Sequence, residues 1–181
     1  MKNGKILVGI THGDINGVGY EIILKLFSEP MMLELCTPII YGSPKVATYH
    51  RKAMELTTNF VTIQKGDEAV EGRLNLVDCL TDEVKIDFGQ PSAESGKAAL
   101  AALERAMADY REGLFDVLVT APINKATIQG DGFHFPGHTE YIQERAGEGR
   151  EALMILMNDV LRVALVTTHL PIRDVAQAIT K

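Results

Sequence analysis

The sequence is poor in cysteine, has no excess of positive charge and contains no long apolar run, and each absence excludes a class of protein. Its two cysteines, Cys36 and Cys79, lack CxxC spacing, so we expect neither a disulfide scaffold nor a zinc knuckle, and the expected compartment is a reducing cytoplasm. The formal net charge of −6, without any Lys/Arg run, argues against nucleic-acid or membrane-surface binding. No apolar stretch approaches the roughly 18 residues that span a bilayer. The composition therefore predicts a soluble protein with no nucleic-acid or membrane partner.

Strand and helix patterns alternate in the first third of the chain. Residues 5–11, 38–41 and 60–63 are short apolar runs, typical of strands that are buried on both faces. A helix with an apolar stripe is predicted over 20–27, and another over 43–56, where Ser-Pro forms an N-cap followed by proline at the first helical position. This β-α-β-α-β order predicts an α/β fold with a largely parallel sheet covered by helices.

Residues 64–89 interrupt this alternation with glycines, acidic residues and two short predicted strands, 74–79 and 84–88. We expect this segment to be an excursion, either an antiparallel hairpin or a crossing into another lobe. The longest helix is predicted over 91–113, because its alanine-rich body has high helix propensity. Residues 116–120 then form another apolar strand.

The last third of the chain contains shorter predicted elements. A short helix or turn is expected at 126–129 and a helix at 138–146. Two strands are predicted at 152–157 and 161–168, separated by an Asn-Asp turn pair, and a helix at 172–180 follows a proline.

A glycine-rich segment, GDINGVG at residues 13–19, lies between the first strand and the first helix. Glycines at such a junction let backbone amides approach an anion at a helix N-terminus. The spacing is neither GxGxxG nor that of a P-loop, so a ligand loop and a tight structural turn remain alternatives. The carboxylate of Asp14 suits hydrogen bonding to a sugar, an amine or water better than contact with a phosphate.

The segment TAPINK, residues 120–125, follows a predicted strand. Lys125 is placed just beyond the strand end, where its ammonium can pair with a phosphate or carboxylate. The alternative is a solvated surface lysine, which is the usual environment of this residue. Pro122 and Asn124 constrain the loop and favour the functional interpretation.

Three histidines stand in turn-like contexts, and a fourth lies within a helix. If His138 begins a helix, its imidazole, nearby amides and the Thr139 hydroxyl could face one anion; alternatively, Thr139 is a cap and His138 is buried. The HxxxH pair with His134 lies on a proline-containing loop and is not expected to bind metal. His169 follows a strand and is either a structural histidine or a metal ligand, in which case the other ligands must be distant in sequence or on another subunit. His50, on a polar helix face, is expected to be exposed.

Four segments occur here in a characteristic order: GDINGVG, TAPINK, FPGHTE and TTHLPIRD. With them the chain resembles the 4-hydroxythreonine-4-phosphate dehydrogenase family, NAD-dependent enzymes of pyridoxal 5′-phosphate biosynthesis. The resemblance implies an isocitrate/isopropylmalate-dehydrogenase-like fold with two lobes, a cleft between them, and a homodimer. Residues 1–120 would form the first lobe, with an excursion at 64–90, and 121–181 would begin a second lobe that is incomplete here.

The resemblance also implies roles for individual residues. His138 and Thr139 would bind a phosphorylated hydroxy-amino acid, and His169 would ligate a divalent metal (zinc, magnesium or cobalt) together with two later histidines. NAD or NADP would accept the hydride, and decarboxylation would follow. Asp14, Asn124 and Lys125 are candidate site-lining residues.

The chain departs from the family pattern in two motifs and in length. The glycine loop usually reads GEPAGIG, and a histidine is common where Asn124 stands. Family members continue well beyond residue 181, and that continuation supplies the remaining metal ligands and most of the nucleotide site. We therefore expect an inactive amino-terminal portion of such an enzyme. A dehydrogenase of phosphorylated threonate or erythronate and a non-catalytic phosphate-binding module are the alternatives.

Overall fold

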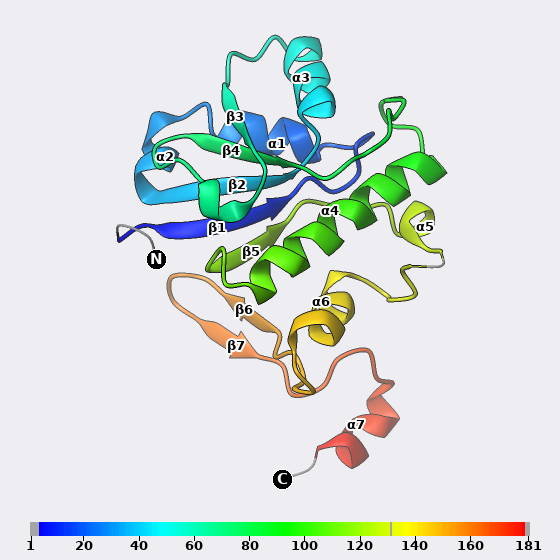
Figure 1. Ribbon diagram of the computed structural model, residues 1–181. Coiled ribbons are helices and arrows are strands. Elements are labelled where there is room, and N and C mark those ends of the chain that lie inside the picture. The colour runs from blue at the N-terminus through cyan, green and yellow to red at the C-terminus, as the bar shows by residue number, and fades with distance from the viewer. Residues whose placement is uncertain (1–3, 131, 180–181) are drawn as a thin grey trace.

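A five-stranded parallel sheet organises the structure, a computed structural model that describes residues 4–130 and 132–179 (Figure 1). The strands lie in the order β3-β4-β2-β1-β5, and every neighbouring pair is parallel. Their carboxyl ends therefore share one edge, where the loops that follow them meet. The strands are β1 (Ile6–Thr11), β2 (Cys36–Gly42), β3 (Phe60–Ile63), β4 (Leu74–Asp78) and β5 (Val117–Thr120).

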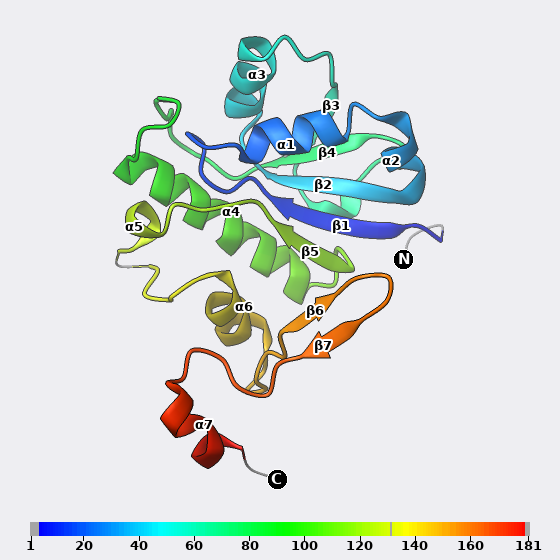
Figure 2. The same ribbon diagram turned by 180° about the vertical axis from the view of Figure 1, so that it is seen from behind.

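Helices cover both faces of this sheet (Figures 1 and 2). Successive side chains of a strand point to opposite faces, so Ile39 and Ile40 of the central strand β2 enter different apolar clusters, and both are fully buried. Ile40 packs in the cluster with residues of α1 and α3, whereas Ile39 packs in the cluster with residues of α4. The helices of this region are α1 (Gly19–Leu26), α2 (Pro30–Leu35), α3 (Pro44–Ala53) and α4 (Ala93–Arg111), with a 3₁₀ turn, η1, at Gly66–Glu68.

The predicted β-α-β-α-β order is confirmed and the strand predicted at 74–79 is formed, but the expectation that this part of the 64–90 excursion leaves the main sheet is wrong. Residues 74–78 form β4, which lies inside the main sheet between β3 and β2. The predicted strand at 84–88 is not formed; this segment is irregular, and part of it hydrogen-bonds to the glycine loop. Helix α2 was not predicted, although Pro30 at its first position is a recognised start signal.

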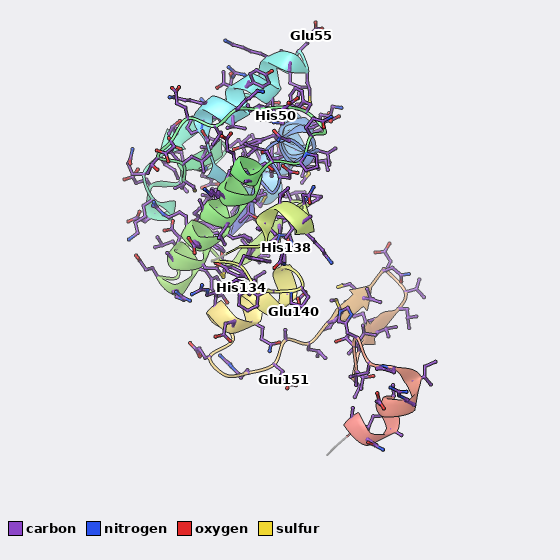
Figure 3. The ribbon with its side chains drawn as sticks, turned by 90° about the vertical axis from the view of Figure 1, so that its right-hand side faces the viewer. His50, Glu55, His134, His138, Glu140 and Glu151 are labelled. Atoms are coloured by element: carbon purple, nitrogen blue, oxygen red, sulfur yellow. The ribbon has the colours of Figure 1, made fainter. Side chains whose placement is uncertain are left out.

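The prediction that His50 is exposed is wrong, because its side chain on α3 is buried (Figure 3). It lies on α3 with its Nε2 atom 2.7 Å from the carbonyl oxygen of Ile15 in the glycine loop. Its ring also contacts the rings of Tyr20 and Phe88. His50 follows the buried Val46 and Ala47 by four and three positions, so it lies on the inward face of α3 and not on its polar face.

Helix α6, the β6–β7 hairpin and α7 lie beyond the β5 edge of the main sheet, and α5 lies beside one end of α4 (Figures 1 and 2). Helix α6 packs against α4 through an apolar cluster that includes Leu103, Met107 and Tyr141. The two last strands form a separate antiparallel hairpin and are shorter than predicted. These elements are α5 (Lys125–Ile128), α6 (His138–Ala146), β6 (Ile155–Met157), β7 (Arg162–Ala164) and α7 (Ile172–Ala178).

Two further predictions concern the last helix and the bilayer. Helix α7 begins where predicted, and residue 180 of the expected 172–180 helix lies outside the described residues. Within the described ranges, none of the helices combines the length and the apolar character needed for crossing a membrane.

Candidate functional site

A pocket of about 260 Å³ at the N-terminus of α6 joins four residues that the sequence singled out: Lys125, His138, Thr139 and His169. They come from α5, from the first turn of α6 and from the loop before α7. Lys125 and His138 meet because α5 and α6 both pack on α4, and His169 joins them from the loop before α7. The rest of the lining consists of Ile123, Pro136, Gly137 and Glu140.

The first turn of α6 forms one wall of the pocket, where uncapped backbone amides stand beside the carboxylate of Glu140. Gly137 is the N-cap residue with extended backbone, and no side chain caps the helix. The first amides of a helix have no intrahelical acceptor, and they carry the positive end of the helix dipole. Thr139 is therefore not the cap, contrary to one of the two alternatives, and its exposed hydroxyl stands in the first turn. Together with the ammonium of Lys125, the first amides of α6 suit a phosphate or carboxylate.

His138 is half-buried at the base of this turn (Figure 3). Burial lowers the pKa of its imidazole, and the nearby charge of Lys125 lowers it further, so the ring is neutral near pH 7. Its Nε2 atom is shielded from solvent and has no hydrogen-bond partner among the described residues. A buried polar atom without a partner is rare in folded proteins, which makes this nitrogen a candidate ligand contact.

His169 lies between this pocket and a second one of about 300 Å³. Its φ of 58° places a non-glycine residue in the left-handed region, a strained conformation that clusters at functional sites. The second pocket also contains two carboxylates, those of Glu140 and Glu151, and no lysine or arginine lines it.

The described residues hold no group of three or more histidine, cysteine, aspartate or glutamate side chains suited to a metal ion. His169 is thus a single candidate ligand, whereas protein metal sites of the catalytic zinc type use three protein ligands. His134, the other histidine of this region, is exposed and does not line either pocket.

Comparison with known proteins assigns this arrangement to a family. Residues 34–181 match the family described as pyridoxal phosphate biosynthetic protein PdxA. The chain belongs to this family. It is 64% identical, over all of its 181 residues, to half of a 4-hydroxythreonine-4-phosphate dehydrogenase from Bacteroides thetaiotaomicron. It is also 33% identical to a D-threonate 4-phosphate dehydrogenase from Cupriavidus necator, where the match covers 96% of the chain and 52% of the relative.

The fold of this family member agrees with that of solved relatives. A crystal structure of a 4-hydroxythreonine-4-phosphate dehydrogenase from Burkholderia phymatum superposes with a TM-score of 0.85 at 31% identity, over 97% of the chain and 53% of the relative. The family resemblance and the isocitrate/isopropylmalate-dehydrogenase-like fold predicted from the motifs are confirmed. The chain spans about half the length of the relatives it matches.

Two of the candidate site-lining residues do not line either pocket in this family member, and their side chains have local structural contacts. The Oδ1 atom of Asn124 accepts hydrogen bonds from the amides of Ala126 and Thr127 at 3.0 and 3.3 Å, so it caps α5. The Oδ1 atom of Asp14 accepts one from the amide of Asn16 at 2.9 Å, which closes a turn inside the glycine loop. Asn124 contributes to the pocket indirectly, because it caps the helical turn that begins with Lys125.

The glycine loop, which follows β1, packs tightly against the segment that follows β5. Gly13 has a φ of +72°, and a Cβ atom there would lie 2.3 Å from the carbonyl oxygen of Pro122. The amide of Asp14 donates to the same oxygen at 2.9 Å. The loop thus makes a tight turn in contact with the segment that leads to Lys125.

Sequence reasoning did not assign a role to Asn16 or Glu140. Asn16 is buried, and its side chain bonds to the carbonyl of Gln90 at 2.8 Å and to the amide of Asp87 at 2.9 Å. It thereby ties the glycine loop to the segment before α4. Glu140 lines both pockets and stands in the GHTE motif, so a signal for it was present.

Proposed function

We propose that this chain forms part of an NAD-dependent and divalent-metal-dependent dehydrogenase that oxidises 4-hydroxy-L-threonine phosphate. The β-keto acid product would lose carbon dioxide, as a step of pyridoxal 5′-phosphate biosynthesis in the cytoplasm. The observation that carries the proposal is the pocket in which Lys125 and the α6 N-terminus lie beside His138, Thr139 and His169. The 64% identity to a protein named as this dehydrogenase supports it.

The end of the pocket that contains Lys125 and the first turn of α6 would hold the substrate phosphate. Lys125 supplies a full charge and the first α6 amides supply hydrogen-bond donors. The unpartnered Nε2 atom of His138 and the hydroxyl of Thr139 would then hydrogen-bond to the substrate and fix its orientation. Holding a substrate in one reactive orientation removes entropy from the barrier, which is a major source of rate enhancement.

His169 would hold the metal together with ligands from outside the described residues, because it has no suitable companions within them. When bound, a divalent ion there would stabilise negative charge on the substrate oxygen. We propose NAD or NADP as hydride acceptor, bound mainly by parts of the protein beyond this chain. The isolated chain would then bind phosphate but not oxidise substrate.

The exposed apolar side chains of the β6–β7 region fit a two-lobed homodimer. Val160 is 94% exposed, Leu156 58% and Met157 66%, an unusual concentration for a surface without a partner. We propose that the first lobe comprises residues 1–120, that 121–181 begin a second lobe, and that the rest of this lobe and a second subunit cover the apolar surface.

NADH formation by a full-length protein that carries this chain tests the proposal. With 4-hydroxy-L-threonine phosphate and NAD, we expect absorbance at the NADH wavelength to rise. Lys125→Met should raise the KM roughly 10- to 100-fold, because a hydrogen bond to a charged group contributes about 1.5–3 kcal/mol. His169→Ala should abolish turnover, whereas the matched control His134→Ala should not change it. NADH production by the isolated 181-residue chain would contradict the proposed division of the active site.

D-threonate 4-phosphate is the alternative substrate, because several relatives are named as dehydrogenases for it. The two substrates share the phosphate but differ in the amine. The carboxylates of Glu140 and Glu151 in the second pocket favour the cationic amine of hydroxythreonine. A substrate panel on the full-length protein, compared by kcat/KM, decides between the two, and a higher value for the threonate would overturn this preference.

A further inference from the structure

Gly96 stands where a helix should disfavour it. It is the fourth residue of α4, it is buried, and the helix that follows it is rich in alanine. Glycine is the least favourable residue in a helix interior after proline, and alanine is the most favourable. The place of Gly96 in an otherwise strong helix therefore points to a requirement of the tertiary structure.

The requirement is the direct contact between α4 and α5. A Cβ atom on Gly96 would lie 1.8 Å from the carbonyl oxygen of Thr127, 2.4 Å from its carbonyl carbon and 2.9 Å from the amide nitrogen of Ile128. All three are backbone atoms of α5, which no side-chain rotation can move aside. Any residue except glycine at position 96 would hold α5 away from α4.

Helix α5 is a single short turn that carries Lys125 at its start. Asn124 caps it, the hydroxyl of Thr127 donates to the carbonyl of Asn124 at 3.2 Å, and the amide of Ile128 donates to the same carbonyl at 3.1 Å. These bonds all join Asn124 to residues 126–128, so they close the turn that contains Lys125. A shift of Thr127 is transmitted to Lys125, two residues away.

We propose that Gly96 is a positioning residue, whose missing side chain lets α5 pack directly on α4 and thereby sets where Lys125 reaches into the pocket beside His138. This inference rests on the proposed function, in which Lys125 binds the substrate phosphate. With alanine at position 96, the contact must open by about 1.5 Å to reach an ordinary separation, and Lys125 moves with it. The attraction between the ammonium and the anion falls as their distance grows.

Binding of inorganic phosphate to the 181-residue chain, followed by NMR shifts of the Thr139 and Glu140 amides, tests the proposal. We expect Gly96→Ala and Lys125→Met each to weaken phosphate binding about fivefold or more. The double variant should bind no more weakly than Lys125→Met alone, because both changes act on one ammonium. If Gly96→Ala weakened phosphate binding without acting through Lys125, the fold-losses in affinity of the two single variants would multiply in the double variant.

Two further variants separate positioning from general damage. Gly9→Ala also overpacks a buried site, since its Cβ would lie 2.9 Å from the ring of Phe115, but it is remote from α5 and should leave phosphate affinity unchanged. Ala99→Val adds two methyl groups in the apolar cluster that contains Ile128 of α5, so it should separate α4 from α5 by less than Gly96→Ala does. It is the variant to measure if Gly96→Ala does not fold. It should weaken binding less, again only when Lys125 is present.

The outcomes distinguish this inference from the function on which it rests. If the unmodified chain shows no phosphate shifts at α6, the assignment of the pocket fails and the role of Gly96 fails with it. If the unmodified chain binds phosphate and folded Gly96→Ala binds it equally well, only the positioning role is overturned. Equal loss of affinity in Gly9→Ala would also overturn it, because the effect would not be specific to α5.

Discussion

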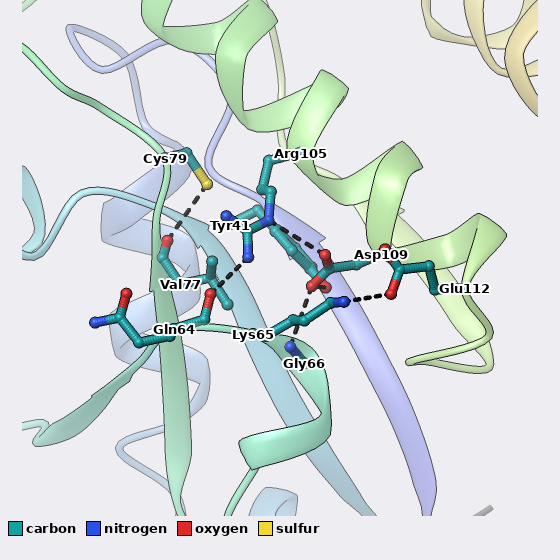
Figure 4. Close-up of polar contacts among 9 residues, drawn as sticks. All are labelled: Tyr41, Gln64, Lys65, Gly66, Val77, Cys79, Arg105, Asp109 and Glu112. Atoms are coloured by element: carbon teal, nitrogen blue, oxygen red, sulfur yellow. Dashed lines mark hydrogen bonds and ion pairs between the residues drawn. The ribbon is translucent and has the colours of Figure 1, made fainter.

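Replacing Asp109 by alanine should destabilise the protein more than almost any other single change in α4. The carboxylate of Asp109 is 1% exposed and accepts hydrogen bonds from the hydroxyl of Tyr41 at 2.9 Å, the amide of Gly66 at 3.1 Å and the Nε atom of Arg105 at 3.2 Å (Figure 4). Tyr41 and Gly66 are themselves buried. One side chain therefore joins α4 to β2 and to the 3₁₀ turn after β3.

The size of the effect follows from these three contacts. Asp109→Ala leaves the hydroxyl of Tyr41 and the amide of Gly66 buried without an acceptor, and each such donor costs about 1–3 kcal/mol. Arg105 is about one-third exposed, so water replaces much of its lost interaction and its share is small. The free energy of unfolding should fall by about 3–5 kcal/mol, a large part of the 5–15 kcal/mol typical of a folded domain.

Urea unfolding followed by circular dichroism measures this change from the midpoint and slope. Glu112→Gln is the matched control, because Glu112 is the C-cap residue of α4, three positions after Asp109, and pairs with Lys65 on the surface. We expect that control to stay close to the unmodified protein, since exposed ion pairs contribute little. When Tyr41 is already replaced by phenylalanine, Asp109→Ala should lower the free energy of unfolding by about 1 kcal/mol or more less than it does alone. The reason is that the Tyr41 hydroxyl is then no longer present as a buried donor without an acceptor. A loss no larger than that of Glu112→Gln would refute the reasoning.

Three further predictions concern the titrating groups and the cap of α5. Burial lowers the pKa of His12 to about 4, the backbones of Ala98 and Gly13 act in the opposite direction, and neither ring nitrogen has a partner in hydrogen-bonding geometry within the described residues. Between pH 6.5 and 4 the imidazole of His12 takes up a proton only in the unfolded chain. The free energy of unfolding therefore has its full contribution from neutral His12 above pH 6.5, and it falls by about 3 kcal/mol as the pH drops to 4. His12→Phe, which keeps the stacking on Tyr20, should flatten the pH dependence of unfolding in that window, and an unchanged slope would rule this origin out. Lys125→Met should raise the pKa of His138 in an NMR titration, because the lysine charge lowers it, and an unaltered pKa would show that the two groups are not close in solution. Asn124→Ala should cost about 1 kcal/mol in urea unfolding through loss of the α5 cap. It should also weaken phosphate binding, and tight binding by that variant would show that the cap does not place Lys125.

The fold was predictable wherever its signals are local. Apolar runs bounded by turns indicated β1, β2, β3 and β5, and the Ser43-Pro44 start signal indicated α3. The position of β4 was not predictable, because a parallel strand pairs with residues far away in sequence and its own pattern does not say which neighbours it has. The hydrogen-bond partner of His50, the carbonyl of Ile15 on another element, was likewise not predictable, although its helical spacing from Val46 and Ala47 does indicate burial.

The sequence by itself singled out candidate side chains of the pocket: the His138-Thr139 pair at a helix start and His169 before a proline are readable because motif and turn are continuous in the chain. It could not separate Lys125 from Asn124, since both stand in the same loop. Tertiary structure decided that Lys125 reaches the pocket whereas Asn124 turns back to cap α5. The physical reason is that the position of Lys125 depends on how closely two helices approach, and that distance is set by the absence of a side chain at Gly96, which no local pattern reveals.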